Sequence, residues 1–365
     1  MKKVILGLVV VVAWLYSTSS FALTCGATAR DNKICVGTAN QFAGGFAPTG
    51  TQGGFGGATS CVATKTPVVF IHGNADSAIS FDAPPKQVAG YTAPPHSMYA
   101  ELKAQGYKDC ELFGVTYLTT SEQDSTLAQY NYHKESYDNT VTNFITAVLA
   151  YTGKTKVDII AHSFGVTVSM SALKYNAKWS KVNKFIAISA GMRGLGSCYY
   201  TGYMNAYAPV CGSQNIFDQY VFGFWPDGWA GASNTWTGAT SSNSFRKAPS
   251  YNTAVSFYSI GSARKDHIAC TATYNVSTCG DTQLFNAYAN VLSQLNVGMG
   301  TEASVLDYNW SDGYIWNQAG GDTDGVGHYL SKSNTGKIVY QMLNSTCTGA
   351  ACATTYTVHG TATAR

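Results

Sequence analysis

The sequence carries little charge. Asp, Glu, Lys and Arg make up 12% of its 365 residues, against about 25% in an average soluble protein. The 23 basic and 20 acidic residues nearly balance, and removal of Lys2 and Lys3 with a leader would leave 21 against 20, a net charge of +1. Such a balance gives no reason to expect nucleic acid or an acidic polymer as partner. The surface must be covered largely by uncharged polar and aromatic side chains, since the chain holds 24 Tyr, 16 Phe and 7 Trp.

The chain also lacks a CxxC pair, which disfavours zinc-binding and thioredoxin-like readings. Its ten cysteines are an even number, and in an exported chain this argues for disulfide bonds. The spacing favours four short-range pairs and leaves a fifth, although sequence alone does not fix the connectivity. The favoured pairs are Cys25–Cys35, Cys61–Cys110, Cys198–Cys211, Cys270–Cys279 and Cys347–Cys352.

No run of apolar residues is long enough to span a bilayer. The apolar stretch 4–16 follows Lys2 and Lys3, and Ser20-Phe21-Ala22 is a small-x-small cleavage site. This pattern is typical of a secretory signal peptide. We therefore expect residues 1–22 to be removed, the mature chain to begin at Leu23, and the product to be extracellular without a membrane anchor.

No linker, repeat or low-complexity tract divides the rest of the chain, so residues 23–365 are predicted to form a single catalytic domain. Apolar runs typical of buried parallel strands alternate with stretches of helical spacing, which predicts a doubly wound, mostly parallel α/β sheet. Strands are expected at 66–73, 111–118, 156–161, 182–189 and 254–260, and helices at 138–151, 164–176, 281–295 and 335–343.

Residues 191–250 have no clear periodicity and are rich in Tyr, Phe and Trp. A long insertion in a compact domain is usually functional or mobile. This one follows the carboxyl end of a predicted strand, where open α/β sheets bind ligands. We interpret it as an aromatic-rich cap, whose aromatic side chains either contact substrate or form the cap's own small core.

The segment from Val157 to Val166 places Ser163 in a small-x-Ser-x-Gly turn between a predicted strand and a predicted helix. This is the context of the nucleophile in the α/β-hydrolase fold. The turn is so tight that the flanking positions must be small, and Ala161 and Gly165 meet that need. A serine in such a turn can also be a simple helix N-cap.

A nucleophilic serine needs a base, and the base needs an acid that orients it. The chain order in this fold is Ser, then Asp or Glu, then His. Of the histidines that follow Ser163, His328 lies in a glycine-rich loop before the last predicted helix, the usual place of the base. The first acid after the strand 254–260 is Asp266. The alternatives are His267 and His359 for the base and Asp281, Asp322 and Asp324 for the acid.

The negative oxygen of the reaction intermediate needs two backbone donors. One is the N–H of Phe164, directly after the nucleophile. The other is expected in the loop after the first central strand, and there we choose the N–H of Asn74. Because the donor is backbone, this reasoning gives the Asn74 side chain no part in the chemistry.

The chain resembles extracellular poly(3-hydroxybutyrate) depolymerases of the single-domain type that attacks native, amorphous polymer. The resemblance extends over essentially the whole mature chain and all ten cysteines. Two departures are Phe164, where the family commonly has Met, and a shorter region 228–237. The segments that carry the resemblance include 23–26, 70–74, 113–117, 129–133, 161–163, 197–203, 254–258 and 325–328.

The resemblance implies a lipase-like serine esterase with the triad Ser163, Asp266 and His328, an oxyanion hole at Asn74 and Phe164, and no metal or organic cofactor. It implies a monomer that binds a hydrophobic polyester or granule surface. In the absence of a separate binding domain, we expect Tyr130, Tyr132, Tyr203, Trp225 and Trp229 to contact the polymer. The alternatives are a secreted lipase, general carboxylesterase or polyesterase, and a surface-binding protein without activity.

Overall fold

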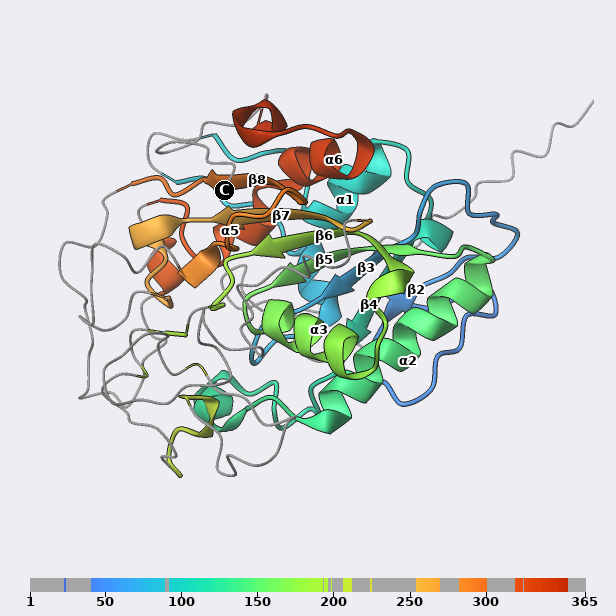
Figure 1. Cartoon of the computed structure of the whole chain (residues 1–365), viewed down its shortest axis with the longest axis horizontal. Helices are drawn as coiled ribbons and strands as arrows, with labels where there is room; N and C mark the ends of the chain where they lie inside the picture. Colours follow the sequence, from blue (N-terminus) through green and yellow to red (C-terminus); the bar gives the residue numbers. More distant parts are fainter. Residues whose placement is uncertain are drawn as a thin grey trace, which may run out of the picture.

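An eight-stranded sheet forms the centre of this computed structural model, which describes residues 23, 41–88, 92–192, 194–195, 198, 206–211, 224, 254–269, 282–300, 319–323 and 325–353. The strand order is β1-β2-β4-β3-β5-β6-β7-β8 (Figure 1). All neighbouring strands run parallel except β2 and β4, which are antiparallel. The strands are β1 (Gln41–Phe42), β2 (Gly53–Gly56), β3 (Val68–Ile71), β4 (Leu112–Thr116), β5 (Val157–His162), β6 (Val182–Ile188), β7 (Ser256–Gly261) and β8 (Val291–Asn296).

Helices cover both faces of the sheet (Figure 1). Helices α2 and α3 pack on one face, and α1 and α6 pack on the other, against separate apolar clusters. In β3, Val69 and Ile71 belong to the first cluster, while Val68 and Phe70 belong to the second. Side chains alternate between faces along a strand, so a strand buried on both faces reads as a continuous apolar run. The helices are α1 (Met98–Ala104), α2 (Glu135–Thr152), α3 (Phe164–Tyr175), α5 (Leu330–Ser333) and α6 (Gly336–Asn344).

Short 3-10 helices connect many of these elements. Two of them matter for the site: η1 (Ala78–Asp82) follows the loop after β3, and η3 (Ser125–Tyr130) follows β4. The others are η2 (Asp109–Glu111), η4 (Trp179–Lys181), η5 (Pro209–Cys211), η6 (Ala263–Lys265), η9 (Ala319–Gly321) and η10 (Gly349–Ala353).

The architecture confirms the predicted α/β-hydrolase class, a doubly wound and mostly parallel sheet. The five predicted strands correspond to β3, β4, β5, β6 and β7, and three of the four predicted helices correspond to α2, α3 and α6. The predicted helix at 281–295 is wrong, because strand β8 occupies Val291–Asn296 and pairs with β7. The side chain of Gln294 bonds the backbone N–H and C=O of Phe285, which holds the preceding segment in a non-helical path. Tertiary pairing here overrides residues of good helix propensity.

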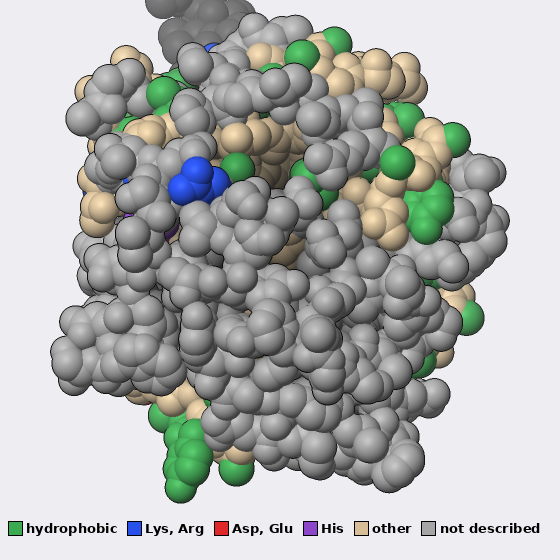
Figure 2. Space-filling view, turned by 60° about the vertical axis from the view of Figure 1, so that its left-hand side comes forward, with side chains coloured by type: hydrophobic (Ala, Val, Ile, Leu, Met, Phe, Trp, Pro, Cys, Tyr) green, Lys and Arg blue, Asp and Glu red, His purple; other side chains and the backbone are tan. Residues whose placement is uncertain are grey.

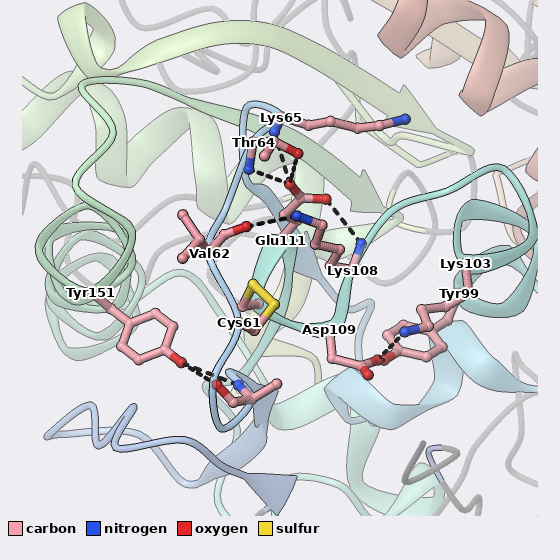
Figure 3. The surroundings of a disulfide bond; sticks show 12 residues. Cys61, Val62, Thr64, Lys65, Tyr99, Lys103, Lys108, Asp109, Glu111 and Tyr151 are labelled. Atoms are coloured by element: carbon pink, nitrogen blue, oxygen red, sulfur yellow. Dashed lines mark hydrogen bonds and ion pairs between the residues drawn. A yellow bond between two sulfur atoms is a disulfide. The ribbon is translucent and has the colours of Figure 1, made fainter. Parts of the chain in front are cut away.

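One corner of the sheet is joined by the disulfide Cys61–Cys110 (Figure 3). Beside it the carboxylate of Glu111, at the amino end of β4, accepts hydrogen bonds from the backbone N–H groups of Thr64, Lys65 and Lys108 and from the Thr64 hydroxyl. Because buried carboxylates must be fully hydrogen-bonded, these contacts fix the chain that leads into β3. The Cys198–Cys211 and Cys347–Cys352 disulfides are also formed, whereas Cys25, Cys35, Cys270 and Cys279 lie outside the described residues.

Several sequence predictions fall where the structure gives no description. The predicted leader at 1–22 lies outside the described residues, and of the predicted cap only 191–192, 194–195, 198, 206–211 and 224 are described. Within the described part of the chain, no helix has the length and apolar character needed to cross a membrane.

Candidate active site

Ser163 lies in a sharp turn between β5 and α3, with backbone angles φ 54° and ψ −126°. A positive φ is strained for a residue other than glycine. The turn brings α3 close to the end of β3, because a Cβ atom on Gly165 would lie 2.2 Å from the carbonyl oxygen of His72. Glycine at this position therefore follows from a close approach of two backbones, as the motif predicted.

The ring of His328 bridges Ser163 and Asp266. Its Nε2 lies 3.0 Å from the Ser163 Oγ, and its Nδ1 lies 2.9 and 2.8 Å from the two carboxylate oxygens of Asp266. A carboxylate can only accept, so Nδ1 carries the proton and Nε2 accepts from the serine hydroxyl. His328 is 3% exposed and Asp266 is fully buried. The arrangement can remove a proton from Ser163 and stabilise the imidazolium that results.

The carboxylate of Asp266 is held by its own loop and by a neighbouring segment. Its Oδ1 accepts from the backbone N–H groups of Ile268 and Ala269 at 3.0 and 2.9 Å, and its Oδ2 accepts from the Gln283 side chain. The rival carboxylate of Asp322 instead accepts from the backbone N–H groups of Gly327, Tyr329 and Leu330. Asp322 therefore shapes the loop that carries His328 and does not contact the imidazole.

Of the remaining alternatives for base and acid, the structure describes one, and the other three lie outside the described residues. His267 is next to Asp266 in the chain, and its backbone N–H donates to the carbonyl of Gly320. His359, Asp281 and Asp324 lie outside the described residues.

Asn74 and Phe164 both line the pocket that contains Ser163 and His328. Within the described residues, neither of their backbone N–H groups donates a hydrogen bond to the protein. Phe164 N–H is at the first turn of α3, where helix amides have no intrahelical acceptor. The two N–H groups are therefore available to a ligand oxygen in this pocket.

A buried ion pair links the base segment to the loop after β3. Lys332, one helical turn after His328, places its Nζ 3.1 Å from Asp76 Oδ2 and 2.7 Å from Ser80 Oγ. Lys332 is 0% exposed and Asp76 is 3% exposed. A lone buried charge is costly, so each of these charges depends on the other.

Two further histidines lie at the site and stay neutral. His162 donates from Nε2 to the carbonyl oxygen of His328 at 3.1 Å, and burial together with the Lys332 charge holds the pKa of His162 well below its ordinary value. Burial lowers the pKa of His72 to about 4, although Asp76 opposes the shift. The His72 ring stacks on Tyr117 with 4.3 Å between centroids. Both rings fix backbone around the site and leave His328 as the base.

The pocket encloses about 710 Å³, part of it open to solvent, and most of its lining is apolar. A mostly apolar lining with a few polar groups is typical of sites that bind small ligands. Figure 2 brings the left-hand side of Figure 1 forward, and the described side chains visible there are mostly hydrophobic or uncharged. The apolar lining includes Phe164, Leu195, Val210, Phe224, Ile268 and Ala269.

Of the predicted polymer-contact residues, Tyr130 and Tyr132 are described, and neither is among the described residues that line the pocket. Tyr130 is 43% exposed at the end of η3, a helix that lines the pocket through Ser125 and Ala128. Tyr132 is partly buried, with the Lys134 ammonium 4.9 Å from its ring centroid. Tyr203, Trp225 and Trp229 lie outside the described residues.

Sequence reasoning missed the groups that support the triad. Gln283, Asp76 and Lys332 come from three segments far apart in the chain, and no local pattern connects them. The Asn74 side chain was given no part, but it makes three hydrogen bonds. The sequence drew attention to the loop after β3 through the segment Phe70-Ile71-His72-Gly73-Asn74. Only the fold shows what the side chains of this loop contact.

Residues 65–218 match the model of a family described as Lipase (class 2), which is 154 of the 365 residues. The chain is also similar to the crystal structure of Aspergillus fumigatus lipase B, with 15% identity, a TM-score of 0.42, and coverage of 78% of this chain and 56% of that chain. Bacillus licheniformis lipase BlEst2 in its propeptide form shows 14% identity and a TM-score of 0.37, with 69% and 49% covered. The chain thus spans about half the length of these two solved structures. No curated protein matches the sequence.

The strand-turn-helix setting of Ser163 and the matched segment agree on the class. The chain has the α/β-hydrolase fold, and its residues 65–218 are similar to the Lipase (class 2) family.

Proposed function

We propose that the protein hydrolyses carboxylic esters with Ser163 as nucleophile, His328 as general base and Asp266 as the residue that orients the imidazole. The observation that supports this most is the continuous chain of contacts from Ser163 Oγ to His328 Nε2, at 3.0 Å, and from His328 Nδ1 to Asp266, at 2.8 Å. Such spacing is what proton transfer from a serine requires.

The reaction proceeds in two halves. Ser163 Oγ attacks the ester carbonyl while its proton passes to His328 Nε2, and the N–H groups of Asn74 and Phe164 bind the oxygen that becomes negative. The intermediate collapses as the imidazolium gives its proton to the departing alkoxide, which leaves as an alcohol. Water then loses a proton to His328 and attacks the acyl-enzyme, and His328 returns that proton to Ser163 Oγ as the carboxylic acid leaves.

As substrate we propose amorphous poly(3-hydroxybutyrate), cut to short oligomers. The support is the resemblance of the mature chain to depolymerases of native polymer, together with a pocket whose lining is mostly apolar. Polymer contact would use Tyr130, Tyr132, Tyr203, Trp225 and Trp229. We further propose export of the chain after cleavage near Ala22, a setting in which its disulfides are stable, and action as a monomer without metal or organic cofactor.

A second candidate is a lipase or general carboxylesterase with the same three residues. The match of residues 65–218 to the Lipase (class 2) family favours it. Acylglycerols and short polyester segments place similar demands on the site, since both present an ester carbonyl between apolar chains. Only the outer contacts of the substrate distinguish the two candidates.

Two clearing assays separate the candidates. Turbidity loss of amorphous poly(3-hydroxybutyrate) granules is compared with hydrolysis of a tributyrin emulsion, with crystalline polymer as a further substrate. We expect rapid clearing of amorphous granules and slow attack on the other two. Rapid tributyrin hydrolysis without granule clearing would support the lipase and exclude the depolymerase.

Ser163→Ala tests the mechanism itself. It should reduce hydrolysis of every substrate by about a thousandfold or more, because members of such a triad act as a unit. The matched control is Ser293→Ala, which removes a buried hydroxyl that donates to the carbonyl of Gly349 at the edge of the sheet. Equal activity of the two variants would show that Ser163 is not the nucleophile, whereas absence of hydrolysis together with failure of an organophosphonate to label Ser163 would leave a binding protein without catalysis.

A further inference from the structure

The side chain of Asn74 joins two segments that are far apart in the chain. Its Nδ2 donates to the carbonyl oxygen of Ala128 at 2.8 Å, and its Oδ1 accepts from Asn131 Nδ2 at 2.7 Å. Ala128 belongs to η3 and Asn131 follows it, and both residues are buried. The loop after β3 is thereby fixed against a segment more than fifty residues further along the chain.

The same Asn74 side chain also fixes its own backbone. Its Oδ1 accepts from the N–H of Ala75 at 2.9 Å, and Ala75 adopts φ 50°. A left-handed conformation is unfavourable for an alanine, so something must hold it. A side chain bonded both to the next peptide and to η3 allows Asn74 one arrangement of its backbone, and this sets the direction of the Asn74 N–H.

We infer that the Asn74 side chain is a positioning residue for the oxyanion hole, and that η3 is the support against which it holds the Asn74 N–H. This inference rests on the proposed function, in which that N–H binds the negative oxygen of the intermediate. The support is rigid on its far side as well, because Asn131 Nδ2 also donates to the carbonyl of Glu122 at 2.7 Å. The Glu122 carboxylate in turn bonds Thr119, Lys134 and Tyr137.

A thionoester reports on the hole separately from the triad. Replacing the ester C=O by C=S leaves the attack by Ser163 in place, but sulfur accepts hydrogen bonds weakly. The ratio of ester to thionoester turnover therefore measures what the hole contributes, and a loss of folded enzyme lowers both rates equally and leaves the ratio unchanged.

The experiment compares three variants of the full chain with wild type on a soluble p-nitrophenyl ester and its thionoester. Asn74→Ala removes all three hydrogen bonds, and we expect kcat on the ester to fall about a hundredfold, the range for loss of one oxyanion donor. KM should stay close to its wild-type value, and the ester-to-thionoester ratio should fall by a similar factor. Asn131→Ala removes one of the three bonds and should give a smaller fall in the same ratio.

The matched control is Asn183→Ala. Asn183 donates to the carboxylate of Asp158 at 2.8 Å near the amino ends of β5 and β6, so it loses a comparable amide contact away from the pocket. Its ratio should equal that of wild type. An unchanged ratio in Asn74→Ala and Asn131→Ala would overturn the inference, and if Asn74→Ala does not fold, Asn131→Ala alone decides it. Absence of wild-type ester hydrolysis and of Ser163 labelling would instead contradict the proposed function.

Discussion

Two buried carboxylates at opposite ends of the sheet, Glu111 and Asp266, are held by the same kind of contacts but have different surroundings. Each is fully buried and accepts several N–H groups from neighbouring chain. Glu111 precedes β4 at the amino end of the parallel strands, while Asp266 follows β7 at the carboxyl end. The partners of Glu111 are backbone amides and a hydroxyl, whereas Asp266 also contacts an imidazole. One titratable partner separates a structural carboxylate from a candidate catalytic one.

Backbone strain is concentrated at the end of the sheet that carries the site. Positive φ values at residues other than glycine occur at Ala75, Ser163, Ser189 and Ala263, each within four residues after the end of β3, β5, β6 or β7, and also at Ser60, beside Cys61, and Ala177, between α3 and β6. Such conformations cost about 1–3 kcal/mol each and persist only where surrounding structure fixes them. At the other end, the Cys61–Cys110 disulfide and the hydrogen bonds to Glu111 hold the chain. We conclude that most of this strain lies at the site end, where side chains fix the backbone, while a disulfide and local hydrogen bonds hold the opposite end.

Exchanging each carboxylate for its amide gives the largest contrast. Asp266→Asn should lower kcat on a soluble ester by about a thousandfold or more, because an amide no longer fixes the His328 tautomer or stabilises the imidazolium. Glu111→Gln should leave kcat unchanged and lower the free energy of unfolding by about 1–3 kcal/mol, since buried donors lose an acceptor. Steady-state kinetics and urea unfolding of both variants measure this.

A third amide variant sharpens that comparison within the site. Asp322→Asn removes a carboxylate that bonds only backbone N–H groups of the His328 loop, so its loss of activity should be far smaller than that of Asp266→Asn. A larger loss for Asp322→Asn would show that the acid is assigned to the wrong residue.

The second contrast concerns two ion pairs. Lys332→Met leaves Asp76 charged and buried without its partner, and such a loss typically costs about 3–5 kcal/mol. Lys103→Met breaks the partly exposed pair of Lys103 and Asp109, which should cost about 0–1 kcal/mol. Both values come from urea unfolding. The double variant Lys332→Met/Asp76→Asn should recover part of the loss, and no recovery would mean that packing of the lysine stem, not charge, is what matters.

The sequence predicted features that have a local pattern better than contacts between residues far apart in the chain. The turn at Ser163 has a short motif, and the known order of residues in the fold selected Asp266 and His328, which the structure places in contact. Strands buried on both faces read as apolar runs and were found at β3 to β7. Their amphipathic covering helices on one face, α2 and α3, were found for the same reason.

The parts that escaped prediction depend on partners distant in sequence. Strand β8 carries residues that also suit a helix, and only pairing with β7 decides its conformation. Strand β1 has only two residues and strand β2 is rich in glycine, so neither has an apolar signature. The contacts of Asn74 with Ala128 and of Lys332 with Asp76 join residues more than fifty positions apart, and no pattern in a single sequence encodes them.

Disulfide removal tests the covalent side of the comparison. The Cys61–Cys110 bond closes a separation of 49 residues and the Cys347–Cys352 bond one of five. By the chain-entropy estimate, replacing each pair with serine should cost about 4 and about 2 kcal/mol, respectively. Thermal and urea unfolding measure the losses, and activity per folded molecule should stay unchanged. If the Cys61–Cys110 variant lost activity without losing stability, the corner would be coupled to the site. Thiol titration of the native protein should find no reactive cysteine.

The smallest effect is the pH dependence of the Glu111 contribution. Burial alone would raise the pKa of Glu111, but the N–H groups of Lys65, Lys108 and Thr64 outweigh it and hold that pKa below its usual value. A carboxyl with a lowered pKa in the folded state stabilises the fold above its unfolded pKa of about 4.3, and this stability is lost as pH falls through the folded pKa. Glutamine resembles the protonated form. The difference in unfolding free energy between wild type and Glu111→Gln, about 1–3 kcal/mol at neutral pH, should therefore shrink below pH 4.

In the same experiment, the contribution of Asp158 to the free energy of unfolding should change with pH in the opposite direction. Burial raises the pKa of Asp158 to about 7, so the folded state holds a proton that the unfolded chain has already released. Its stabilising effect is present below the unfolded pKa of about 3.9 and is lost as pH rises toward 7. Urea unfolding of Asp158→Asn and Glu111→Gln from pH 3 to pH 8 should give differences from wild type that change in opposite directions. Parallel curves would mean that the hydrogen bonds to Glu111 do not hold its charged form, and the contrast with Asp266 would then need another physical basis.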